Sequence, residues 1–405
     1  MNRSGIALLW EGKMTSSDSR ASKSNDYAIV LVPGFAGWGR DELLGFKYWG
    51  GLHDIEADLS DQHYETYTAA AGPVSSNWDR ACELYAMLKG GQVDYGEVHA
   101  SRYQHQRYGR TYEGLIPGWG DLNAASGRIT KVHLVGHSLG GQTARTLIQL
   151  LEQGSNEERT TTPDGTLSEL FRGGKQWVHS ATSISTPHDG TTLVYGVTEV
   201  APMIQQVASR LAAIAGVLHE PIYDFKLDQW NLRRQPDESL TDYIARVRNS
   251  EIWKATHDIS SWDLSIEGAQ ELNSWVRSSP GVYYFSWATR STIEIPGSRW
   301  IPRPTTFPPF IATSEFMAQY KESHAGPAES WWPNDGVVNT ISMNGPKLGS
   351  TDAIVNIGPQ PVLGVWNYMG LMDSYDHADI IGIGTVRDVR DWYRSLAELL
   401  TSLPA

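Results

Sequence analysis

The pentapeptide Gly136-His137-Ser138-Leu139-Gly140 places a serine hydroxyl between two glycines. A Gly-x-Ser-x-Gly sequence between a strand and a helix is typical of a nucleophile elbow, a sharp turn that exposes the serine at the end of a sheet. An apolar run at residues 131–135 precedes the pentapeptide, and apolar residues at helical spacing follow it over residues 141–151. A glycine-serine turn that caps a helix would share the bare pattern, but this context favours a nucleophile.

A serine hydroxyl needs a base to take its proton and an acid to orient that base. In folds with a nucleophile elbow these partners follow the serine in the order Asp or Glu, then His. His377 lies near the C-terminus, before a predicted final helix at residues 386–400, and is the candidate base, although an exposed loop histidine would also fit there. Asp189 and Asp335 both satisfy the chain order for the acid, and either could instead belong to a structural turn. The residue pattern leaves this choice open.

Acyl transfer also needs two backbone N–H groups directed at the developing oxyanion. Leu139, which follows the serine, would supply one of them. The glycine-rich loop at residues 33–39 follows a predicted strand, and Phe35 within it would supply the second N–H.

Strands that alternate with helices must position these residues. Such alternation predicts an α/β fold with a mostly parallel central sheet and helices on both faces, and sites in such sheets form at the carboxyl ends of the strands. We expect a tail at residues 1–26 and a single domain at residues 27–405 with insertions at about 73–128 and 191–280. Strands are predicted at residues 27–32, 64–68, 132–135, 176–184 and 282–287, and a helix at residues 78–88.

The second insertion contains an amphipathic stretch at residues 203–219, with Ile204, Val207, Leu211, Ile214 and Leu218 on one helical face. This pattern is common to ordinary surface helices packed on a core. It also fits a lid whose apolar face covers the serine in water and opens at an oil surface.

The composition narrows the class of protein. The chain has 405 residues, a net charge of −13 and a single cysteine, Cys82. The acidic balance argues against nucleic acid as a partner, and one cysteine excludes an intramolecular disulfide. No apolar stretch approaches the length of a membrane span, and the short apolar run at residues 6–10 is too brief for a signal-peptide core.

Several longer motifs resemble one known family, the thermoalkalophilic Bacillus/Geobacillus lipases known as bacterial lipase family I.5, which have the α/β-hydrolase fold. The resemblance covers residues 27–400 and implies Ser138, Asp335 and His377 as the triad, Phe35 and Leu139 as oxyanion donors, a helical lid and secretion. The chain departs from the family pattern at Gly136 and Leu139, where those lipases have Ala and Gln, and at Pro33, where a histidine is expected. The motifs are Gly34-Phe35, Gly37-Trp38-Gly39-Arg40, Leu44-Gly45-Phe46-Lys47-Tyr48-Trp49-Gly50-Gly51, Ser75-Ser76-Asn77-Trp78-Asp79-Arg80, Thr186-Pro187-His188-Asp189-Gly190, Ile222-Tyr223-Asp224-Phe225 and Asn334-Asp335-Gly336.

The resemblance also implies zinc ligands at Asp79, His99, His105 and Asp263. Two imidazoles and two carboxylates suit a closed tetrahedral zinc site of the structural kind, and this site would join the first insertion to the second. The family's calcium site is represented by Asp379, but Gly384-Thr385 stands where those lipases have Asp-Pro. We therefore do not expect a tight calcium site.

These observations predict a serine ester hydrolase of lipase type that acts on triacylglycerols and similar hydrophobic esters at a lipid–water interface. A carboxylesterase or polyester hydrolase with the same triad is the nearest alternative. A non-catalytic binding protein with this fold is the alternative from another class, and reaction with a serine-directed phosphonate would separate it from an enzyme.

Overall fold

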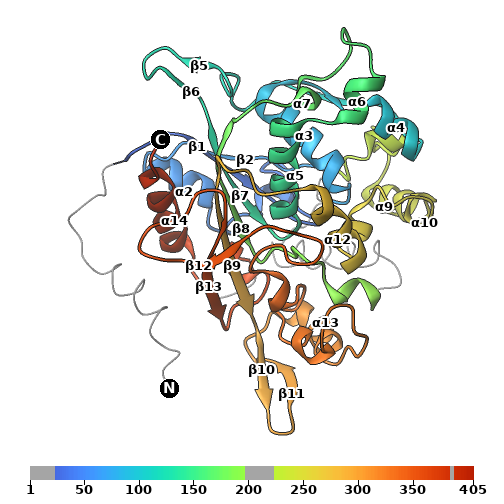
Figure 1. Ribbon diagram of the computed structural model, residues 1–405. Coiled ribbons are helices and arrows are strands. Elements are labelled where there is room, and N and C mark those ends of the chain that lie inside the picture. The colour runs from blue at the N-terminus through green and yellow to red at the C-terminus, as the bar shows by residue number, and fades with distance from the viewer. Residues whose placement is uncertain (1–22, 197–222, 384–386) are drawn as a thin grey trace.

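The computed structural model describes residues 23–196, 223–383 and 387–405 (Figure 1). Its centre is a seven-stranded sheet in the order β12-β13-β9-β8-β7-β1-β2, in which every pair of neighbouring strands is parallel. The strands are β1 (Ala28–Val32), β2 (Thr66–Thr68), β7 (Val132–His137), β8 (Val178–Ile184), β9 (Tyr283–Arg290), β12 (Ile354–Asn356) and β13 (Trp366–Asp373).

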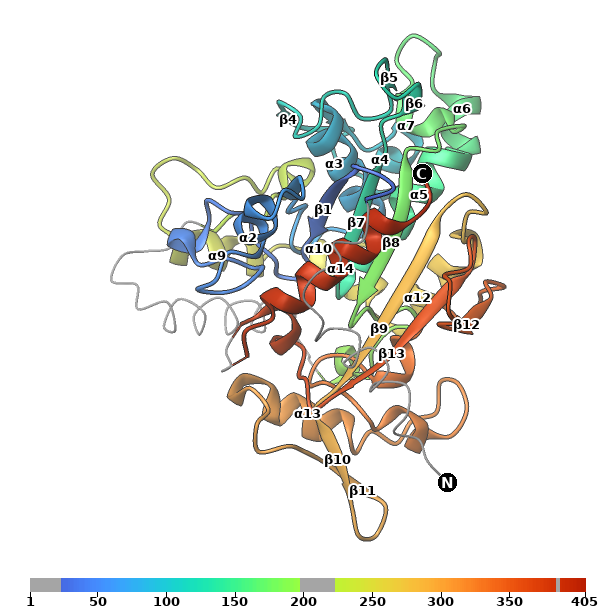
Figure 2. The same cartoon turned by 90° about the vertical axis from the view of Figure 1, so that its left-hand side faces the viewer.

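Helices cover both faces of this sheet, as Figures 1 and 2 show. The five residues of β1 are all apolar and buried, as expected for a parallel strand covered on both sides. Ile29 and Leu31 belong to the hydrophobic core that includes α2 (Ile55–Asp61) and α14 (Arg390–Ser402). The alternate residues of β1 face the second core, which includes α3 (Asn77–Lys89) and α5 (Leu139–Gln153).

Shorter elements surround this framework. Among the described residues, three two-stranded antiparallel sheets lie outside the central sheet: β3 (Gly91–Asp94) with β4 (Tyr108–Tyr112), β5 (Leu122–Asn123) with β6 (Arg128–Ile129), and the hairpin of β10 (Thr292–Ile295) with β11 (Arg299–Pro302). The β10–β11 hairpin projects away from the sheet (Figure 2). The remaining helices are α4 (Glu97–Tyr103), α6 (Asn156–Thr161), α7 (Glu169–Arg172), α9 (Leu240–Arg248), α10 (Ile252–Ala255), α11 (Ser260–Asp263), α12 (Ile266–Trp275) and α13 (Ile311–Met317).

The predicted alternation of strands and helices is confirmed, and each of the five predicted strands matches a strand of the sheet. The helix predicted after the serine is α5, which ends at Gln153 and is capped by Gly154, whose φ of 66° is one that glycine adopts readily. Strands β12 and β13 were not predicted. The predicted amphipathic stretch at residues 203–219 lies outside the described residues, as do Gly384, Thr385 and most of the tail at residues 1–26. Among the described helices, none has the length and apolar character needed to span a membrane.

Candidate active site and metal cluster

Ser138 occupies a tight turn between β7 and α5, at the carboxyl end of β7. Its φ of 56° and ψ of −131° are strained for a residue with a side chain. A Cβ atom on Gly136 would lie 2.4 Å from the Gly140 carbonyl carbon, and one on Gly140 would lie 2.1 Å from the Val32 carbonyl oxygen. In this backbone neither position accommodates a Cβ atom without a shift, which explains the two glycines and agrees with a strand–turn–helix at the serine.

His377 follows β13, and its ring lies beside Asp335. The His377 Nδ1–H donates to Asp335 Oδ2 at 2.8 Å. Asp335 is fully buried, and its carboxylate also accepts hydrogen bonds from the Thr289 hydroxyl and from the amides of Val337 and Val338. These bonds hold the carboxylate in one orientation, so the Nε2 lone pair of His377 is left for a proton from elsewhere.

Ser138 and His377 line the same pocket, and the two residues are 4 % and 7 % exposed. No hydrogen bond joins the Ser138 hydroxyl to the His377 ring in the described part of the chain. Such bonds are often long until substrate binds. The pairing of Asp335 with His377 is the arrangement that a serine triad requires.

Asp189, the competing aspartate, has a structural role. Its Oδ1 accepts hydrogen bonds from the amides of Lys347 and Leu348, and its Oδ2 forms an ion pair with the Lys347 ammonium at 3.0 Å. The carboxylate thus joins the loop after β8 to the loop before β12, and it does not contact His377.

The two predicted oxyanion donors lie in the turn that contains Ser138 and in the loop after β1. Leu139 is the first residue of α5, so its N–H has no acceptor within the helix, and the helix N-terminus favours negative charge there. Phe35 lies in the loop after β1, next to Gly34, where a Cβ atom would lie only 2.6 Å from Ser138 Cβ. Neither amide donates a hydrogen bond to another described protein group.

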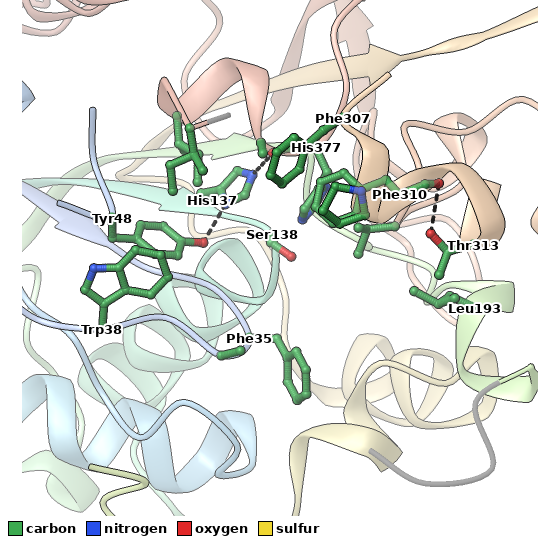
Figure 3. Close-up of a pocket in the computed structure, with 16 residues that line it drawn as sticks. Phe35, Trp38, Tyr48, His137, Ser138, Leu193, Phe307, Phe310, Thr313 and His377 are labelled. Atoms are coloured by element: carbon green, nitrogen blue, oxygen red, sulfur yellow. Dashed lines mark hydrogen bonds between the residues drawn. The ribbon is translucent and has the colours of Figure 1, made fainter. Parts of the chain in front are cut away.

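The pocket above Ser138 is apolar. Figure 3 shows the Ser138 hydroxyl directed into it, with Phe35 on one side and Phe307 and Phe310 on the other. The Phe307 amide donates to Asp376 Oδ2 at 2.7 Å, which ties this aromatic wall to the residue before His377. The apolar side chains that line the pocket include Phe35, Trp38, Leu193, Phe307, Phe310 and Ile381. An apolar acyl chain would therefore be desolvated beside the nucleophile.

A second cluster of ionisable residues lies apart from the triad. Each of Asp79, His99, His105 and Asp258 offers one ligand atom, and these four atoms lie within 4.8 Å of one another. The His99 Nε2 is 3.1 Å from Asp258 Oδ1, and the His105 Nε2 is 3.1 Å from Asp258 Oδ2. Asp79 Oδ1, both Nε2 atoms and Asp258 Oδ2 are buried without a hydrogen-bond partner, which fits a set of atoms directed at a cation.

The surroundings of this cluster orient its side chains. The His105 Nδ1–H donates to the Gln106 carbonyl, which leaves Nε2 as the ligand atom, and Gln229 donates to Asp79 Oδ2 at 2.7 Å. Burial and the charge of Asp258 raise the pKa of Asp79. Although burial opposes it, the carboxylates of Asp258 and Asp79 raise the pKa of His99 to about 9. Two nitrogen and two oxygen ligands suit a divalent metal such as zinc.

The prediction of Asp263 as the fourth ligand is wrong, because Asp258 occupies that place. The Asp263 carboxylate instead accepts a hydrogen bond from the Asn77 amide at the start of α3. Burial raises the pKa of Asp263 to about 8. The two aspartates are five positions apart in one segment, and nothing in the local sequence distinguishes a ligand from a helix-end acceptor.

Asp379, the candidate calcium ligand, is buried two residues after His377. Its Oδ2 accepts a hydrogen bond from the Asp376 amide at 3.0 Å and lies 4.0 Å from the Arg387 Nε. A guanidinium beside the carboxylate offsets part of the negative charge that a calcium site needs.

Comparison with known proteins gives consistent matches. The family model "Lipase-like, C-terminal domain" matches residues 25–403. Lipase 1 of Staphylococcus aureus strain MRSA252 is 35% identical over 92% of this chain and 54% of its own length, so the chain spans about half the length of such curated relatives. Among solved structures, lipase 1 from Pelosinus fermentans is 52% identical with a TM-score of 0.87, covering 94% of this chain and 99% of that one. EstA from Clostridium botulinum is 46% identical with a TM-score of 0.87, covering 96% and 90%.

Proposed function

The chain belongs to the lipase family whose model is described as lipase-like, C-terminal domain, and from this premise we propose that it is a serine hydrolase of apolar carboxylic esters. The observation that most supports this activity is the strained Ser138 beside His377, whose ring is bound to the buried Asp335. The finer resemblance to the Bacillus/Geobacillus lipases, the lid at residues 203–219 and secretion remain proposals that rest on the sequence.

The catalytic cycle follows from these positions. The Ser138 Oγ attacks the ester carbonyl carbon while His377 Nε2 takes its proton, and Asp335 stabilises the resulting imidazolium. The amides of Phe35 and Leu139 bind the tetrahedral oxyanion. The imidazolium then protonates the leaving alkoxide, which departs as an alcohol and leaves an acyl group on Ser138. A water molecule, deprotonated by His377, attacks this acyl-enzyme and releases the carboxylic acid.

The activity is tested with p-nitrophenyl esters from two to sixteen acyl carbons, with Ser138→Ala as the control. We expect the highest kcat/KM at medium or long chains, because the pocket is lined by aromatic and aliphatic side chains, and no turnover by Ser138→Ala. A preference for the shortest esters would favour a carboxylesterase. Absence of turnover and of labelling by a serine-directed phosphonate in the unchanged protein would refute hydrolase activity.

The four-residue cluster is proposed as a structural zinc site held by Asp79, His99, His105 and Asp258. When bound, the metal would neutralise the two buried carboxylates and crosslink α3 and the α4 region to the segment before α11. The residues of the triad are separate from this cluster, so no catalytic step depends on the metal directly.

The zinc proposal is tested by the metal content of the purified protein, measured by mass spectrometry. One equivalent of zinc is expected in the unchanged protein and well below one in Asp258→Asn. Asp263→Asn is the matched control, since its amide oxygen still accepts from Asn77, and it is expected to keep its zinc. Equal loss in both variants, or retention in Asp258→Asn, would overturn the assignment of Asp258.

A further inference from the structure

The peptide group between Pro33 and Gly34 directly precedes the oxyanion donor Phe35, and side chains hold it from both sides. Arg80 Nη2 donates to the Pro33 carbonyl oxygen at 2.6 Å. On the other edge, the Gly34 N–H donates to the Tyr48 hydroxyl oxygen at 3.0 Å. Arg80 is fully buried and Tyr48 is 6 % exposed, so water does not replace these bonds. A peptide plane held at its carbonyl and at its amide cannot rotate without breaking one of them.

The Arg80 side of this clamp continues to the other oxyanion donor. Arg80 Nε donates to the Thr143 hydroxyl oxygen at 2.8 Å. Thr143 lies one turn into α5, and its hydroxyl hydrogen is shared between the Leu139 carbonyl oxygen and Asn77 Oδ1, each 3.1 Å away. The guanidinium is therefore connected to the residues of both oxyanion donors, Phe35 through the Pro33 carbonyl and Leu139 through Thr143.

The Tyr48 side continues to the nucleophile and the base (Figure 3). The Tyr48 hydroxyl lies 2.7 Å from His137 Nδ1, and His137 Nε2 lies 3.0 Å from the backbone carbonyl oxygen of His377. That carbonyl only accepts, so Nε2 carries the hydrogen and Nδ1 accepts from Tyr48. Burial lowers the pKa of His137 well below its ordinary value, in agreement with this neutral ring. The single hydrogen of Tyr48 is thus committed to His137, and its lone pair receives the Gly34 N–H.

From this double connection we propose that Tyr48 and Arg80 are positioning residues that clamp the Pro33–Gly34 peptide and so hold the oxyanion donors at a fixed place relative to Ser138 and His377. The proposal rests on the ester hydrolase function above and names how its oxyanion site is fixed. Neither side chain touches the reacting atoms through its polar group. Gly34 lacks a side chain that could anchor the loop, because any Cβ would meet Ser138, and Pro33 offers no N–H. The Pro33–Gly34 peptide is therefore held by these two partners, while beyond Phe35 the Ala36 amide donates to the Pro73 carbonyl oxygen at 2.8 Å.

Tyr48→Phe tests the clamp, because it keeps the ring and removes only the hydroxyl. Tyr284→Phe is the matched control: that buried hydroxyl also accepts a backbone N–H, from Ser279 at 2.9 Å, but lies away from the pocket. Outright loss of an oxyanion donor costs about 10²–10³ in kcat, so a loosened donor is expected to cost about 10-fold to 100-fold. KM should stay within about twofold, since the apolar lining is unchanged.

A second readout separates positioning from general stability. A trifluoromethyl ketone forms a tetrahedral adduct with the serine and needs the same oxyanion donors, so its affinity should fall by the same factor as kcat in Tyr48→Phe. Tyr284→Phe should keep both values while showing a comparable change in melting temperature. Unchanged kcat in Tyr48→Phe, or an equal loss of kcat in Tyr284→Phe, would overturn the clamp.

The Arg80 side is tested through Thr143, because removing a buried guanidinium could unfold the protein. Thr143→Val removes the hydroxyl that joins Arg80 to Leu139, and we expect kcat to fall about 10-fold, as for one lost hydrogen bond of a charged group. Thr143→Ser should restore it. Failure of serine to rescue a folded variant would count against this link. Refutation of the proposed hydrolase function would look different from refutation of the clamp, because the unchanged protein would then neither turn over esters nor react with the phosphonate.

Discussion

Acidification is expected to destabilise this protein through a buried histidine on the central sheet. His179 lies on β8 and is 5 % exposed. Burial, together with the charge of Lys131, lowers its pKa to about 4, whereas an unfolded histidine titrates near 6.5. Below pH 6.5 the unfolded chain therefore binds a proton that the folded chain does not. The free energy of unfolding must therefore decrease as the pH is lowered from about 6.5 to about 4, the pKa of His179 in the folded protein.

The size of this effect follows from the two pKa values. A difference of about 2.5 units corresponds to about 3 kcal/mol over the whole range, and integration from pH 7 to pH 5 gives about 2 kcal/mol. The neighbouring His133 acts in the same direction, since burial and the proximity of His179 lower its pKa well below the ordinary value. The His179→Gln variant removes one of these two groups.

Urea unfolding at pH 7 and pH 5 measures the contribution. The difference in unfolding free energy between the two pH values should be about 2 kcal/mol smaller in His179→Gln than in the unchanged protein. His53→Gln, at an exposed position, serves as the control and should leave that difference unchanged. If His179→Gln shows the full pH dependence of the unchanged protein, His179 is not held neutral by burial and the reasoning is refuted.

Further predictions concern the site. Asp335→Asn should lower kcat about 10⁴-fold in ester assays, because the amide no longer selects the productive ring tautomer; a loss below tenfold would contradict its role. Thr289→Val removes a 2.7 Å hydrogen bond to Asp335, and kcat should fall about tenfold while the protein stays folded by circular dichroism. In Gly34→Ala the new Cβ would lie 2.6 Å from Ser138 Cβ, so phosphonate labelling should slow at least about 100-fold. A strong chelator should lower the melting temperature of the unchanged protein but leave that of Asp258→Asn unaltered.

Strand β1 was predictable because burial on both faces requires a continuous apolar run. Strand β13 carries no such run. Asn367 is buried within it and uses its side chain to bind the Tyr284 and Val362 backbone oxygens. The register also shifts between Tyr368 and Gly370, which interrupts the alternation of side chains. Its place between β9 and β12 is determined by these tertiary contacts, which no local pattern displays.

The residues of the proposed triad were predictable to different degrees for a similar reason. The position of Ser138 could be predicted from its flanking glycines. A Cβ atom at either glycine would collide with the backbone of the turn itself or of the adjacent strand. The choice between Asp189 and Asp335 depends on which loop meets His377, and that is a long-range property. The resemblance to the lipases supplied what the residue pattern alone left open.

The error at the metal cluster has the same origin. Ile259 pairs with Ser75 in an isolated antiparallel bridge, and this pairing brings the preceding residue, Asp258, against the start of α3. Asp263, five residues later, reaches the Asn77 amide instead. The register of a two-residue bridge between segments almost 200 positions apart is set by packing, so spacing within the segment could not reveal which aspartate is the ligand.

The departures of Pro33 and Leu139 from the family pattern fall where the proposed chemistry uses the backbone. Proline lacks only its N–H, and the group of Pro33 that the clamp uses is its carbonyl oxygen, bound to Arg80. Leu139 contributes an N–H at the start of a helix, and its carbonyl is joined to Thr143 whatever its side chain. Substitution at these two positions therefore changes what surrounds the oxyanion site, while the hydrogen bonds that orient it involve only the backbone atoms of these two residues. We expect the side chain of residue 139 to affect substrate preference more than turnover, and Leu139→Gln compared across acyl lengths would measure this.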